Sequence, residues 1–107
     1  MILYTKPIKV CNLDYEVVNE EVIIHDDLSI DGHILPSNTT IRVRSNMSLP
    51  YYKQALMHET VHAILLAFCL DFIEEEQLER FVDCMASGFL TVMRDNPDLV
   101  KYFMEEK

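Results

Sequence analysis

The segment His58-Glu59-Thr60-Val61-His62 constrains this chain most, because its residue types and spacing suit a metal site when the segment is helical. Side chains four residues apart on a helix project from the same side, so both imidazoles can bind one ion. Glu59 is rotated by about 100° from His58 and can reach a water molecule on that ion. The pattern therefore predicts a Zn²⁺ site with His58 and His62 as ligands and Glu59 as general base. The alternative is an ordinary helix in which the two histidines only pack or cap.

The flanking residues support a helix around this segment. Ser48 is a suitable N-cap and Pro50 fits the first turn, so we expect a helix over about 49–69. Apolar residues that recur at helical spacing predict its core-facing stripe, with the two histidines at the margin. These residues are Met57, Val61, Ile64 and Phe68.

Two further helices are expected in the C-terminal half. Asp71 and Glu74 resemble a capping box that opens a helix over roughly 72–94. Asn96 and Pro97 then end that helix and cap a short last one, at about 97–106.

The N-terminal half favours β structure. Short β-rich runs at 8–11, 15–18, 32–35 and 39–44 are separated by turn residues, whereas 20–27 is ambiguous between strand and helix. Because strands precede helices, the order predicts an α+β fold, with a small antiparallel sheet packed on a helical half. Residues 1–107 should form a single domain, since there is no linker and the length suits one core.

Charge and composition narrow the possible partners. Nine basic and eighteen acidic residues give a net charge of −9, which argues against nonspecific binding to nucleic acid or to an anionic membrane. The N-terminal residues lack the apolar region of a secretory signal, and no apolar run is long enough to span a membrane. The three cysteines show no metal or redox spacing. We therefore expect a cytoplasmic protein with reduced thiols.

A catalytic zinc ion needs a third protein ligand, and the acidic cluster that begins at Glu74 offers several candidates. Glu79 and Asp83 share one helical stripe next to the apolar one, so Glu79 is the predicted ligand, and Asp83 would accept a hydrogen bond from a ligand imidazole. Glu75 is the reserve candidate. The alternative is that these acids are solvated and complement the helix dipole.

The sequence H-E-T-V-H-A-I-L at 58–65, followed by E-x-x-x-D at 79–83, resembles the ImmA/IrrE family of metallo-endopeptidases, in particular its short phage- and prophage-encoded members. The resemblance covers roughly residues 39–97. It implies a zincin-like domain with His58, His62 and Glu79 as zinc ligands and Glu59 as base. Two departures are Thr60-Val61, where the family commonly has Leu-Gly, and Asp83, where Asn is usual.

Two functions of different classes follow. The first is a zinc-dependent endopeptidase that hydrolyses a peptide bond in a protein substrate, which by family analogy could be a transcriptional repressor. The second is a zincin-like zinc-binding interaction module without peptidase activity. In the first case, the strand at 39–44 could present a sheet edge to an extended peptide. His25, His33, Tyr51, Tyr52 and Arg94 are possible oxyanion donors, of which the two histidines are left out of the predicted site.

Overall fold

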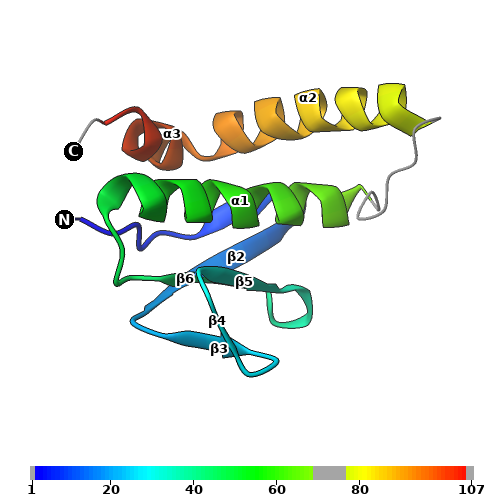
Figure 1. Ribbon diagram of the computed structural model, residues 1–107. Helices are drawn as coiled ribbons and strands as arrows, with labels where there is room; N and C mark the ends of the chain where they lie inside the picture. The colour runs from blue at the N-terminus through cyan, green and yellow to red at the C-terminus, as the bar shows by residue number, and fades with distance from the viewer. Residues whose placement is uncertain (1, 69–76, 106–107) are drawn as a thin grey trace.

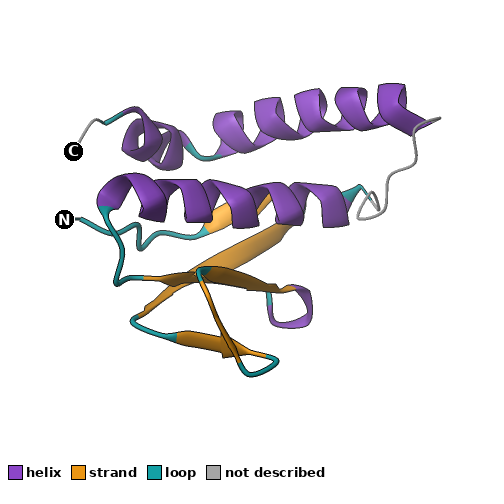
Figure 2. Cartoon of the chain, viewed as in Figure 1, coloured by secondary structure: helices purple, strands orange, loops and turns teal. Residues whose placement is uncertain are grey.

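The chain folds into a mixed sheet covered by one long helix, with two further helices packed over that helix (Figure 1). This computed structural model describes residues 2–68 and 77–105, apart from the side chains of residues 78–80, 82–84 and 86. All strands precede all α-helices, which confirms the α+β prediction (Figure 2). No helix in these ranges is long and apolar enough to cross a membrane.

The main sheet has the strand order β1-β2-β6-β5. The strands are β1 (Ile8–Val10), β2 (Leu13–Glu20), β5 (Gly32–Leu35) and β6 (Thr40–Arg44). Neighbours β1 and β2, and β5 and β6, are antiparallel hairpins, but β2 and β6 run parallel. The prediction of an antiparallel sheet was therefore wrong. Local turn residues specify each hairpin, whereas the β2–β6 pairing joins segments that no short-range signal links.

The strand predicted at 39–44 is not an edge strand, because β6 lies between β2 and β5. Its two arginines, Arg42 and Arg44, form ion pairs with acidic residues. Arg42 binds Glu20 of β2 through two hydrogen bonds of 3.0 and 2.7 Å. Strand β5 therefore provides the free edge on this side of the sheet.

The segment 20–27, which was ambiguous in the sequence, forms the start of a small separate hairpin. Strands β3 (Ile23–His25) and β4 (Leu28–Ile30) pair antiparallel through a two-residue turn. Asp26 and Asp27 adopt left-handed conformations with φ of 52° and 64°. Such a turn matches the twist of the two strands, and aspartate tolerates this conformation.

The three helices are α1 (Leu49–Ala67), α2 (Leu78–Asp95) and α3 (Pro97–Met104). The predictions of 49–69 and 97–106 agree with α1 and α3 to within two residues. The expected start of the second helix at 72 and its capping box lie outside the described residues. Asn96 does not cap α3 with its side chain. It instead binds the backbone of Lys9 in β1 through two hydrogen bonds of 2.9 Å and so fastens α2 to the sheet.

The buried face of α1 differs from the predicted stripe. Ile64 is fully buried as expected, but Met57, Val61 and Phe68 are only half-buried. The fully buried apolar positions of α1 are Tyr52, Leu56, Ala63 and Ile64. The reason is that α1 lies between the sheet and α2, so apolar residues occupy much of its circumference and a single stripe is not defined.

Helix α2 crosses α1 at Gly88, where there is no room for a larger residue. A Cβ atom at this position would overlap with the side chain of Ile64. The absence of a side chain thus lets the two helices approach closely. This contact places the middle of α2 next to the C-terminal part of α1.

Candidate metal centre and catalytic site

His58 and His62 lie one turn apart near the middle of α1, and both side chains are exposed. Their Nε2 atoms are 3.2 Å apart. Two nitrogen ligands at 2.0–2.1 Å from a tetrahedral zinc ion are about 3.3 Å apart. The histidine pair, as we call these two residues, therefore fits two corners of a zinc coordination sphere.

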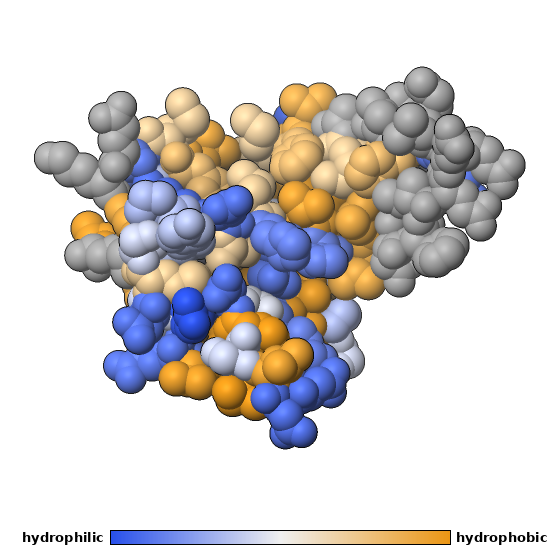
Figure 3. All heavy atoms as spheres, in the orientation of Figure 1, coloured by the Kyte–Doolittle hydropathy of each residue, from blue (hydrophilic) through white to orange (hydrophobic). Residues whose placement is uncertain are grey.

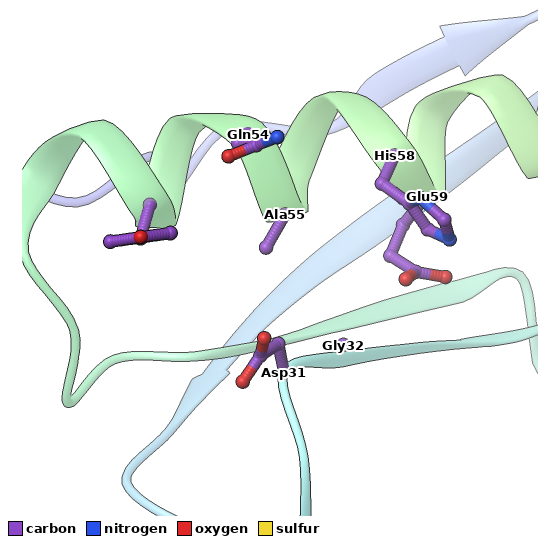
Figure 4. Close-up of a pocket in the computed structure, with 7 residues that line it drawn as sticks. Asp31, Gly32, Gln54, Ala55, His58 and Glu59 are labelled. Atoms are coloured by element: carbon purple, nitrogen blue, oxygen red, sulfur yellow. The ribbon is translucent and has the colours of Figure 1, made fainter.

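Glu59 follows His58 but points to a different environment. Its side chain lies on the sheet side of α1 and is only 6% exposed, although its carboxylate reaches the pocket in front of β5 (Figure 4). Burial raises the pKa of the Glu59 carboxyl, while the neighbouring His58 and His62 act in the opposite direction. A raised pKa brings a carboxylate closer to the value that suits a general base near neutral pH.

Gly32, the first residue of β5, supports the Glu59 carboxylate from below. A Cβ atom on Gly32 would lie 2.9 Å from Glu59 Oε2, 3.0 Å from Glu59 Cγ and 3.2 Å from the carbonyl oxygen of Arg42. No side chain other than hydrogen fits without displacing one of these atoms. Gly32 therefore helps to determine where the carboxylate lies.

His58 and Glu59 line an open pocket of about 400 Å³ between α1 and the start of β5. We call this pocket the slot. It is lined by Asp31, Gly32, Tyr51, Gln54, Ala55, His58 and Glu59. A slot beside a free sheet edge can receive an extended peptide. The peptide pairing that the sequence suggests for the strand at 39–44 would therefore involve β5 and not β6.

The predicted third ligand, Glu79, falls in a part of α2 whose side chains are not described. Among the described residues there is no group of three His, Cys, Asp or Glu side chains that could hold a metal ion. The side chains of Glu79 and Asp83 and the whole of Glu75 lie outside the described part. Glu79 is the second residue of α2, and it lies about 13 Å of helix rise before Gly88, which packs on Ile64 of α1. The assignment of Glu79 as a ligand stays a prediction.

Of the candidate oxyanion donors Tyr51, Tyr52, His25 and His33, one lines the slot and three do not. Tyr51 lines the slot. Tyr52 is buried, and its hydroxyl donates to Asn19 Oδ1 at 2.6 Å. The rings of His25 and His33 contact each other at a tilt of 45°, with centroids 4.4 Å apart, and neither residue lines the slot.

Sequence reasoning missed Asp31 and Gly32 as parts of the site. The only local signal was an Asp-Gly pair before a β-rich run, and this signal is typical of a turn. Their position next to α1 follows from the pairing of β5 with β6 and could not be derived from spacing. Comparisons with protein-family models, curated proteins and solved structures give no match for this chain.

Proposed function

We propose that this chain is a zinc-dependent endopeptidase, with His58 and His62 as two metal ligands and Glu59 as general base. The observation that carries the proposal is the 3.2 Å separation of the two Nε2 atoms, together with a buried carboxylate from the next residue on the same helix. A group with this geometry suits hydrolysis better than simple packing, because an exposed histidine pair adds little to a core.

Each residue has a defined part in this chemistry. Zinc, when bound, would lower the pKa of its water to about 7 and polarise the peptide carbonyl. The Glu59 carboxylate takes the proton from the attacking water and returns it to the leaving amine. The β5 edge orients an extended substrate through main-chain hydrogen bonds, and Tyr51 offers a hydroxyl at the slot.

The second candidate is a zinc-binding interaction module. It is favoured by the exposure of both imidazoles of the histidine pair, since an ion held there would be accessible to a ligand from a partner protein. This candidate predicts zinc binding without peptide hydrolysis.

The test is a cleavage assay on a mixture of proteome-derived peptides, read by mass spectrometry as new termini. We expect new termini with the zinc-loaded protein, their loss after chelation and their return when zinc is restored. Zinc-loaded protein that produces no new termini would contradict the peptidase proposal and favour the interaction module.

A further inference from the structure

The slot continues well beyond the proposed catalytic residues. Tyr51, Ala55 and Glu59 follow one another at intervals of four residues, so they lie along one side of α1 over about 12 Å of helix rise. Opposite them, Asp31 and Gly32 form the other wall (Figure 4). The small side chain of Ala55 leaves the middle of the slot open, so a substrate side chain can lie along it.

The end of the slot away from Glu59 carries a carboxylate and an aromatic ring, from Asp31 and Tyr51. The Asp31 side chain is 65% exposed and lies below Ala55, in the wall that faces α1 (Figure 4). Tyr51 is 68% exposed, so its ring is accessible as well. A carboxylate beside an accessible aromatic ring is a favourable environment for the side chain of arginine or lysine.

Arg44 is the one competitor for Asp31 that needs to be considered. Its Nη2 atom lies 3.3 Å from Asp31 Oδ1, which is longer than the 2.7–2.9 Å typical of charge-assisted hydrogen bonds. Arg44 does not line the slot, but it lines a neighbouring pocket together with both Asp31 and Tyr51. The loose pair orients the carboxylate and leaves it accessible to a second cation.

We propose that Asp31 and Tyr51 form a subsite that selects an arginine or lysine side chain of the substrate, close to the bond that is cleaved. This inference rests on the proposed function. An acidic substrate residue would be repelled by Asp31, and an apolar one would gain no charge interaction from it. The net charge of −9 also favours the approach of cationic peptides.

The test compares peptides that differ only in charge. A set of acetylated and amidated hexapeptides carries arginine at each position in turn, and a matched set carries citrulline, which has nearly the same shape without the charge. We expect wild-type kcat/KM to favour arginine over citrulline at one position by roughly fivefold to tenfold, a modest ratio because Asp31 is largely solvated. Asp31→Asn should bring this ratio close to one, because the arginine peptides lose their partner carboxylate, whereas the citrulline peptides carry no charge for it to pair with. Asp98→Asn is the matched control, because Asp98 pairs with Lys6 and is not a slot residue.

Binding of the same peptides is measured in parallel by chemical-shift changes at the Asp31 and Gly32 amides, in the Glu59→Gln variant. Cleavage with an unchanged arginine ratio in Asp31→Asn would overturn the subsite and leave the peptidase intact. Charge-dependent binding without any cleavage would instead support the subsite and contradict the peptidase. Equal binding of arginine and citrulline peptides to Glu59→Gln and to its Asp31→Asn double variant would also overturn the subsite.

Discussion

Glu59→Gln is expected to reduce kcat by roughly 10³-fold while zinc stays bound, because glutamine cannot accept the proton of the attacking water. The histidine pair is untouched, so zinc content should equal that of the wild type. Stability at neutral pH should be equal or higher. A carboxyl group whose pKa burial raises is destabilised in its ionised form, and this cost appears as the pH rises through that pKa. The measurements are peptide cleavage, zinc content and a thermal melt of each protein.

Glu21→Gln is the matched control for this prediction. It makes the same chemical change at an exposed residue between β2 and β3, away from the slot. Its activity should match that of the wild type. Retention of full activity in Glu59→Gln would remove Glu59 from the mechanism.

Gly32→Ala is expected to lower kcat/KM by about 10²-fold through displacement of the Glu59 carboxylate. The added methyl group would stand 2.9 Å from Glu59 Oε2 and 3.2 Å from the Arg42 carbonyl oxygen, so either the carboxylate or the strand must move. The strain should also cost about 1–3 kcal/mol in the free energy of unfolding. Zinc content should not change, because Gly32 has no ligand role. Activity is measured well below the melting temperature, so that the folded fraction is complete.

Gly88→Ala separates loss of stability from loss of function. It makes the same substitution at a second crowded glycine, where the added methyl group meets Ile64 at the crossing of α1 and α2 and does not approach Glu59. We expect it to destabilise the protein and to leave kcat/KM largely unchanged while the chain is folded. Equal losses of activity in both variants would show that Gly32 acts through stability and does not position Glu59.

Local signals were sufficient to predict α1, α3 and the two hairpins of the main sheet, β1–β2 and β5–β6. Ser48 and Pro50 mark the start of α1, and Asn96 with Pro97 marks the junction of α2 and α3. Pairing between distant segments was not predictable in this way. The parallel alignment of β2 with β6 depends on the path through β3, β4 and β5, and no residue pattern specifies that path.

The candidate site likewise combines a feature set by local spacing with features that depend on distant segments. The spacing of His58 and His62 is local, and the structure brings their Nε2 atoms together. The burial of Glu59 and its contact with Gly32 depend on the sheet that packs under α1. The wrong stripe on α1 had a related cause. Met57 lines a pocket with residues of α2 and, like Val61, is only half-buried, while Leu56 and Ala63 are fully buried. The choice of Glu79 as a ligand depends on how α2 begins, and a measurement of bound zinc tests it.

The most direct test of the proposed function is the zinc content of the purified protein, determined by elemental analysis. His25→Ala serves as control, because His25 contacts His33 outside the slot. Loss of zinc in Glu79→Ala would identify the third ligand, whereas retention would transfer that role to Glu75 or to another group. We expect one zinc ion per chain in the wild type and in His25→Ala, and none in His58→Ala or His62→Ala. A wild-type protein without stoichiometric zinc, or one that keeps its zinc in His58→Ala, would contradict the proposed metal centre.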